Sequence, residues 1–233
     1  MPVYALSREL AFPPPEEAVD GLLAVGGDLS PQRLLLAYRS GIFPWYDDAL
    51  PILWHAPDPR CVLLTDRLHV GRTLRRELAR RTYDVRFDTD FARVIAACRS
   101  TPRPGQDGTW ITGDMERAYT TLHALGYAHS VETWERGELV GGLYGVSLGR
   151  MFFGESMFSW GPNASKVALV ALAERLAGWG GRVIDAQVAT PHTTAMGAVE
   201  WPRERFLRVL REELAHPTRR GSWAGTPALE PPA

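Results

Sequence analysis

Apolar residues change their spacing along this chain near residue 126. Up to that point the clearest apolar patterns recur every three or four residues, which is the period of an amphipathic helix. In the first such segment Ser30 is suited to cap a helix, Pro31 to occupy its first turn and Gly41 to end it. The same spacing predicts three further helices, over residues 69–81, 89–100 and 113–126.

Beyond residue 126 apolar and polar residues alternate, which is the period of a strand. Residues 128–159 are expected to form three strands joined by tight turns, followed by a helix over 163–181 and a strand over 183–188. A strand, a helix and a strand in this order form a crossover unit, so the two strands are expected to be parallel in one sheet. A last helix is predicted over residues 202–215.

These patterns predict an α+β protein with three regions. Residues 1–65 are rich in proline, glycine and aromatic residues, and we expect a small N-terminal α/β domain there, with too many prolines over 43–60 for regular structure. Residues 66–215 carry the longer helices and the alternating strands, and are expected to form the main domain. Residues 216–233 predict a disordered tail.

Composition and charge narrow the class of protein. The chain has 233 residues, of which 45% are hydrophobic and 23% charged, as in a soluble globular protein. Its net charge of -1 does not by itself indicate a nucleic-acid partner. We find no apolar run long enough for a membrane span and no signal-peptide core, so we expect a cytoplasmic protein without membrane contact. Cys61 and Cys98 lie far apart and are expected to be reduced thiols.

Common cofactor motifs do not explain the chain. The six histidines show no paired metal-ligand spacing, and we find neither GxxxxGK[ST] nor a convincing GxGxxG, so no metal or nucleotide cofactor is predicted. The GVSLG sequence at residues 145–149 matches a nucleophile elbow. A helix should follow Ser147 in that motif, but another predicted strand does, and a hairpin turn is the better interpretation.

Polar side chains interrupt the two strands that flank the crossover helix. In a regular strand Asp185 and Gln187 share a face with Val183, and Glu155 shares a face with its apolar neighbours Phe153 and Met157. Each group has a structural explanation, as a carboxylate satisfied by backbone amides or as a polar network at a strand end. Because ligands bind near the carboxyl ends of strands in open α/β sheets, three such groups around one crossover favour a site.

Aromatic and basic residues add two further candidates. Trp45 and Trp110 lie in predicted loops, where a tryptophan either packs into the core or offers a platform for a flat base. One arc of the helix over 69–81 is basic, and it is either a solvated face or a contact for a phosphate backbone. The arginines of this arc are Arg72, Arg75, Arg76 and Arg80.

Several spaced motifs carry a resemblance to a known family. They include GLLAVGGDLSPQRLLLAYRSGIFPWY, ILWHAPDPR, GTWIT, LVGGLYGVSLG, FFGESMFS, NASK and VIDAQV followed by HTTAMGA. In this order they resemble the leucyl/phenylalanyl-tRNA–protein transferases, and the resemblance covers roughly residues 10–207. DAQ at residues 185–187 departs from the DCQ of some members. Since Ala186 should face away from its two neighbours, we expect little consequence.

The resemblance implies an activity and a set of site residues. Members of this family transfer Leu or Phe, and less well Met, from aminoacyl-tRNA to the N-terminal Arg or Lys of proteins, which produces a bacterial N-degron. It implies a main domain similar to the GNAT acetyltransferases, no cofactor, and aminoacyl-tRNA and acceptor proteins as partners; we expect a monomer. It assigns the reaction centre to Asp185, Gln187 and Glu155, the aminoacyl side-chain pocket to Gly154, Met157 and Ile184, and the surroundings of the tRNA 3′-adenosine to Trp45, Trp110, Tyr38 and Tyr119.

Some alternatives stay open on the sequence. The proton of the attacking amine is accepted either by Asp185, if burial raises its pKa, or through the terminal hydroxyl of the tRNA. A CoA-dependent acetyltransferase is a rival, although the turn SMFSWGPNASK lacks the pyrophosphate-binding loop of such enzymes. A non-catalytic binder of RNA ends or N-terminal peptides is the rival from another class.

Overall fold

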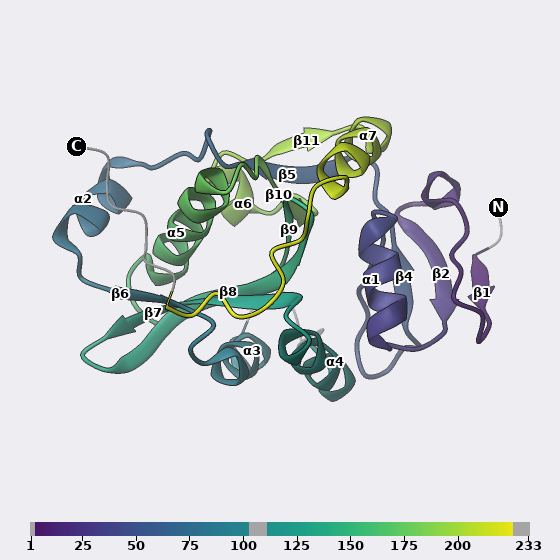
Figure 1. The fold of residues 1–233 in the computed structure, drawn as a ribbon, viewed down its shortest axis with the longest axis horizontal. Coiled ribbons are helices and arrows are strands. Elements are labelled where there is room, and N and C mark those ends of the chain that lie inside the picture. The colour runs from purple at the N-terminus through teal and green to yellow at the C-terminus, as the bar shows by residue number, and fades with distance from the viewer. Residues whose placement is uncertain (1–2, 103–110, 226–233) are drawn as a thin grey trace.

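The computed structural model describes residues 3–102 and 111–225, and these residues form a mixed α+β protein with two sheets (Figure 1). The small sheet has the strand order β1-β2-β4-β3, and the large sheet has the order β11-β5-β10-β9-β8-β7-β6. The small sheet and α1 lie at one end of the molecule, beside the edge of the large sheet that carries α7 (Figure 1). The prediction of an α+β fold is confirmed.

The elements have the following bounds. The helices are η1 (Pro15–Glu17), α1 (Pro31–Arg39), α2 (Arg72–Arg80), α3 (Phe91–Ser100), α4 (Gly113–Ala124), α5 (Ala164–Gly178), α6 (Pro191–Ala195) and α7 (Arg203–Leu214). The strands are β1 (Tyr4–Leu6), β2 (Leu22–Gly26), β3 (Phe43–Pro44), β4 (Leu53–His55), β5 (Arg60–Leu64), β6 (Asp84–Phe87), β7 (Ala128–Glu135), β8 (Glu138–Leu148), β9 (Met151–Ser159), β10 (Val183–Gln187) and β11 (Val199–Trp201).

The boundary of the N-terminal unit lies earlier than residue 65. β5 pairs with β10 and β11 and is therefore an inner strand of the large sheet, so the small unit ends between β4 and β5. The expectation that residues 43–60 lack regular structure is also wrong, because β3 and β4 form there. Pro44 is tolerated because β3 is an edge strand of the small sheet. The helix predicted after Ser30 is confirmed, since the Ser30 side chain accepts a hydrogen bond from the Arg33 amide.

The predicted crossover unit is confirmed. β9 and β10 are parallel neighbours connected by α5, and their register runs from Met151 opposite Val183 to Phe153 opposite Asp185. β9 continues to Ser159, but its pairing with β10 stops at Phe153. The two strands therefore separate beyond this point, and the space between them becomes available to side chains and ligands.

The large sheet has a hydrophobic core on each face. α3 and α4 cover one face, with Phe91, Met115 and Phe153 in that core, while α5 covers the other, with Leu169 and Phe152. No disulfide joins Cys61 and Cys98, and both side chains are buried. None of the helices in the described part of the chain has the length and apolarity needed to cross a membrane.

The expected disorder of the C-terminal tail is wrong for residues 216–225, and residues 226–233 lie outside the described part of the chain. Trp223 is 3% exposed, its ring stacks on His129 with 3.7 Å between ring centroids, and its amide donates to Asp88 Oδ2 over 2.7 Å. One large aromatic side chain thus anchors a segment whose composition otherwise predicts disorder. The segment adds to the core under α5.

Candidate active site

A β-bulge in β9 gives Glu155 its direction. Tyr144 of β8 lies opposite Ser156, and the next residue lies opposite Gly154, so Glu155 is the extra residue of the bulge. The bulge also reverses the alternation of the strand, because Phe153 packs into the core of α3 and α4 whereas Met157 packs toward α5. The prediction that Phe153, Glu155 and Met157 share one face is therefore wrong.

Glu155 lies at the centre of a buried polar network. Its Oε1 accepts hydrogen bonds from the Tyr38 hydroxyl over 2.7 Å and from Gln187 Nε2 over 2.9 Å, and its Oε2 accepts one from the Tyr119 hydroxyl over 2.9 Å. The two tyrosine hydroxyls also contact each other. Three oxygen–oxygen contacts join the two hydroxyls and the carboxyl group, but the two hydroxyls supply only two hydrogens. A proton on Glu155 supplies the third hydrogen.

The network shifts the pKa values of its members. Burial raises the pKa of Glu155 to about 7, although the hydrogen bonds from Tyr38, Tyr119 and Gln187 act in the opposite direction; the charge of Asp185 adds to the increase. Burial raises the pKa of both tyrosines well above the ordinary value, so their hydroxyls stay protonated near neutral pH and act as donors. Glu155 is consequently the group of this network that changes its charge near neutral pH.

Asp185 is held in a buried ion pair. Arg60 donates from Nε to Asp185 Oδ1 over 2.8 Å and from Nη2 to Oδ2 over 2.7 Å, and both side chains are at most 1% exposed. The amide of Gln187 also donates to Asp185 Oδ1, over 2.9 Å. The expected closeness of Asp185, Gln187 and Glu155 is thus found, but a second bulge between Asp185 and Gln187 interrupts the regular strand that the sequence predicts.

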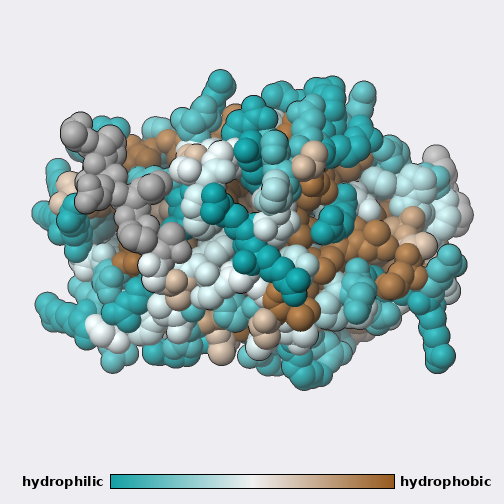
Figure 2. Space-filling model, in the orientation of Figure 1, coloured by the Kyte–Doolittle hydropathy of each residue, from teal (hydrophilic) through white to brown (hydrophobic). Residues whose placement is uncertain are grey.

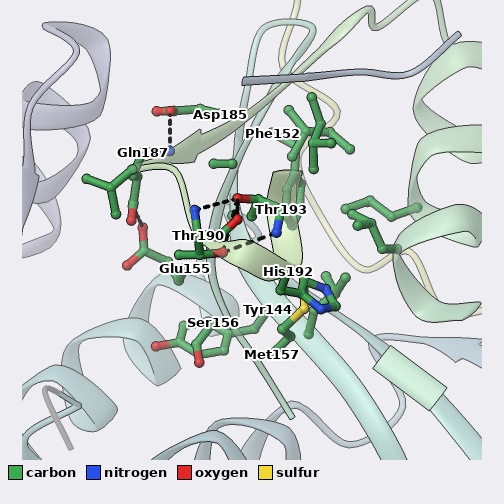
Figure 3. A pocket seen from close by; sticks show the side chains of 18 of the residues that line it. Tyr144, Phe152, Glu155, Ser156, Met157, Asp185, Gln187, Thr190, His192 and Thr193 are labelled. Carbon is green, nitrogen blue, oxygen red and sulfur yellow. Dashed lines mark hydrogen bonds between the residues drawn. The ribbon is translucent and has the colours of Figure 1, made fainter. Parts of the chain in front are cut away.

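A cavity of about 570 Å³ opens where β9 and β10 separate (Figure 3). Gly154, Met157 and Ile184 line it, together with Leu169 and Leu172 of α5. Its polar edge consists of Glu155, Ser156, Asp185, Gln187, Thr190, His192 and Thr193. Ala186 also lines the cavity and packs against the core on the α5 side. Among the residues with described positions, no three His, Cys, Asp or Glu side chains are grouped as metal ligands.

Of the two predicted tryptophans, the structure describes the position of Trp45. Trp45 follows β3, is 37% exposed and lines the cavity, with its ring 5.7 Å from the His55 ring. Trp110 lies outside the described residues. Tyr38 and Tyr119 are completely buried behind Glu155, on α1 and α4. In the view of Figure 2 most hydrophobic surface lies where the small N-terminal unit meets the large sheet.

The basic helix lies away from this site. α2 packs against α5 at the end of the molecule opposite the small sheet (Figure 1). Leu74 of α2 is buried, as its spacing predicts. The four predicted arginines, Arg72, Arg75, Arg76 and Arg80, are exposed.

Several site residues were not predicted. Arg60, Thr190, His192 and Thr193 have no distinguishing spacing in the sequence, apart from the Thr190–Thr193 capping box that begins α6. Arg60 is an isolated basic residue before an apolar run, which is a weak signal of a buried charge.

Comparisons with known proteins match most of the chain to one family. The family described as leucyl/phenylalanyl-tRNA protein transferase matches residues 62–211, and its N-terminal domain matches residues 27–58. The first range begins inside β5, and the second ends between β4 and β5. Among solved structures, L-PGS from Bacillus licheniformis covers 83% of this chain and 71% of its own with 10% identity and a TM-score of 0.41, which is too low to support an argument.

Curated relatives carry the same family name, leucyl/phenylalanyl-tRNA–protein transferase. The one from Myxococcus xanthus (strain DK1622) is 60% identical over 99% of this chain and 100% of its own. The one from Syntrophotalea carbinolica is 57% identical over 94% of this chain and 95% of its own, and that from Xanthomonas oryzae pv. oryzae (strain MAFF 311018) is 56% identical over 95% and 90%. This chain therefore belongs to the leucyl/phenylalanyl-tRNA–protein transferase family.

Proposed function

We propose that this protein transfers Leu or Phe, and less well Met, from aminoacyl-tRNA to the N-terminal Arg or Lys of acceptor proteins, which thereby gain an N-degron. The observation that carries the proposal is the cavity at Glu155, whose lining is mostly apolar and includes a polar edge. Such a cavity suits an apolar side chain whose reacting ester lies at the polar edge. In this proposal the protein acts as a cytoplasmic monomer without a membrane or a cofactor.

The geometry of the large sheet supports the proposed likeness to GNAT acetyltransferases. Parallel β9 and β10 separate after Phe153, and a bulge stands at the point of separation. A donor placed in this gap lies beside both strands and within reach of the side chains that the bulge presents. We assign the aminoacyl ester to this position.

The apolar part of the cavity is assigned to the transferred side chain. Met157 adapts its shape easily, so one slot accommodates both Leu and Phe. Ile184 and Gly154 form the wall near the reaction centre, where a side chain branched at Cβ is crowded. Because discrimination by shape alone amounts to about 1–3 kcal/mol per methylene, some transfer of Met is expected.

The terminal adenosine of the tRNA is assigned to Trp45 at the mouth of the cavity, and to Trp110. Stacking on an exposed indole is independent of the sequence of the tRNA body. Tyr38 and Tyr119 are too deeply buried to stack on the base, so we assign them to holding Glu155 from behind. The arginines of α2 are assigned to phosphate contacts farther along the tRNA.

The proposed reaction is attack of the acceptor α-amine on the ester carbonyl. A C–N bond forms, the C–O bond to the ribose breaks, the amine loses a proton and the departing ribose oxygen gains one. We assign acceptance of that proton to the ionised form of Glu155, which its pKa of about 7 makes available near neutral pH. Gln187 then orients the reacting groups. Asp185 has both oxygens bound by Arg60, so it is also assigned an orienting role and not that of the proton acceptor.

The proposal is tested with radiolabelled Leu-tRNA and a peptide that begins with Arg. We expect label in the peptide, none in a matched peptide that begins with Gly, and none from acetyl-CoA labelled in its acetyl group. The Glu155→Gln variant should lose most of the rate, whereas Glu132→Gln should keep it. Glu132 is also a buried carboxylate, but it bonds Ser130 and Thr89 instead.

Each rival function predicts a different outcome. Acetylation of the peptide would establish a CoA-dependent enzyme. Tight binding of Leu-tRNA by the folded protein without any transfer would establish a non-catalytic binder.

A further inference from the structure

Arg60 is a buried charge that belongs to three parts of the fold at once. It begins β5, it is 1% exposed, and its guanidinium lies between two aromatic rings. The guanidinium carbon is 4.7 Å from the ring centroid of Phe43 in the small sheet and 4.6 Å from that of Phe206 in α7. The edge of the same guanidinium bonds both oxygens of Asp185.

Asp185, which Arg60 holds in place, also contacts the backbone of the turn that follows it. Its Oδ1 accepts the amide hydrogen of Gln187, which is the geometry of an Asx turn. The Val188 amide donates to the Ala186 carbonyl over 2.7 Å, so a three-residue γ-turn is centred on Gln187. Gln187 has a φ of 62°, in the left-handed region that side-chain-bearing residues rarely adopt.

The strained turn aims the Gln187 side chain at Glu155. Its Nε2 donates to Glu155 Oε1 over 2.9 Å, across the mouth of the gap between β9 and β10. A backbone in this conformation persists only where its surroundings hold it. The observed support is the Asp185 carboxylate, whose position is fixed in turn by Arg60.

We propose that Arg60 is a positioning residue of the transfer reaction, which acts through Asp185 to hold the turn at Gln187 and thereby the amide that faces Glu155. The inference rests on the proposed function for its effect on rate. Arg60 does not itself line the cavity, but two of its partners do, Asp185 and Phe43. Of these two contacts, the one with Asp185 continues through hydrogen bonds to Gln187 and Glu155.

Lysine does not replace arginine in this role. A planar guanidinium bonds both carboxylate oxygens with its edge and stacks on aromatic rings with its faces at the same time, whereas an ammonium group is a point charge that lacks this fixed geometry. The Arg60→Lys variant keeps the buried charge of the ion pair but releases the orientation of Asp185. Arg33→Lys is the matched control, because Arg33 is also completely buried and pairs with Asp28, but its contacts stay within the small N-terminal unit.

The first test is steady-state transfer of Leu from Leu-tRNA to the Arg peptide. Arg60→Lys should lower kcat about 100-fold, the loss that a misplacement of about 1 Å produces, with KM for Leu-tRNA close to the wild-type value. In the Gln187→Met background the Arg60→Lys substitution should have little further effect on kcat, because each of the two changes disrupts the same orienting unit. Multiplicative losses in the double variant, or a folded Arg60→Lys protein with wild-type kcat, would overturn the inference.

The second test needs no activity and separates this inference from the proposed function. Amide hydrogen exchange at Gln187 and Val188 should be faster in Arg60→Lys than in wild type, and unchanged in Arg33→Lys. Faster exchange together with an inactive wild-type protein would support the positioning role and refute the transferase. Unchanged exchange at these two amides, or equal acceleration in the Arg33 control, would refute the positioning role itself.

Discussion

Replacing Glu155 by glutamine removes one ionisable group from the cavity while it preserves the shape of the side chain. Wild type carries a carboxyl group whose pKa is raised to about 7, mainly by burial, whereas the unfolded chain has the ordinary value of 4.5. The folded state therefore binds this proton more tightly than the unfolded state. The stability that this group contributes is fully present below about pH 4.5 and is lost as the pH rises through about 7.

The magnitude follows from the difference between the two pKa values. A pKa unit corresponds to about 1.4 kcal/mol, so the contribution that is lost between acidic pH and about pH 8 is about 3 kcal/mol. The glutamine amide of the variant has no proton to lose in this range. The free energy of unfolding of wild type, measured relative to Glu155→Gln, should therefore decrease by about 3 kcal/mol between these pH values.

Urea unfolding at a series of pH values measures this difference. Because every other titrating group is common to both proteins, its contribution cancels when the curves are subtracted. The Glu132→Gln protein is the control for burial, since burial also raises the pKa of Glu132 but this residue lies outside the network of Glu155. A difference between wild type and Glu155→Gln that stays constant from pH 5 to pH 8 would refute the assignment of a raised pKa to Glu155.

Four further predictions concern other parts of the molecule. Trp45→Ala should weaken equilibrium binding of Leu-tRNA by about 1–3 kcal/mol without changing the thermal midpoint, because a partly exposed ring is lost; unchanged affinity would exclude it as the adenine platform. Gly154→Ala should fold normally, since an added Cβ lies 3.5 Å from the Asp185 carbonyl oxygen, but its methyl group should lower transfer of Phe more than of Leu in paired assays; an unaltered Phe-to-Leu ratio would remove Gly154 from the pocket. Trp223→Ala should lower the free energy of unfolding by about 3–5 kcal/mol in urea titrations, and a loss well under 1 kcal/mol would show that the tail does not stabilise the fold. Arg76→Ala should reduce the slope of log K against log salt by about 1 if α2 contacts a phosphate, and an identical slope would show that it does not.

The parts of the fold that follow from local patterns could be predicted from the sequence. The start of α1 is predictable because Ser30 is a local capping signal. The parallel pairing of β9 and β10 is predictable because the apolar spacing shows a strand, a helix and a strand in sequence. The two bulges were not, because one extra residue at Glu155 leaves no trace in an alternating pattern. The same bulges bring Glu155 and Gln187 together. The sequence therefore drew attention to Glu155, Asp185 and Gln187, but it indicated neither their geometry nor their partner Arg60.

Long-range pairing explains the remaining differences. β5 follows a proline-rich segment, so composition places it in the first domain, although it pairs with β10, more than a hundred residues later in the chain. The tail was assigned by its composition, whereas its packing depends on Trp223 and on a binding surface formed by Asp88 and His129. Neither the pairing of β5 nor the packing of Trp223 can be predicted from residues nearby in the sequence.

The cluster of Tyr38, Tyr119 and Glu155 joins three segments that lie far apart in the chain. Tyr38 comes from the small N-terminal unit, so that unit contributes a side chain to the candidate site and is not expected to be exchangeable as an independent module. We expect recombination between relatives at the junction of β4 and β5 to succeed only when the incoming unit brings a tyrosine that fits the recipient's glutamate. The two units are thus expected to be inherited together, and fragments expressed separately are expected to regain activity only after they reassociate.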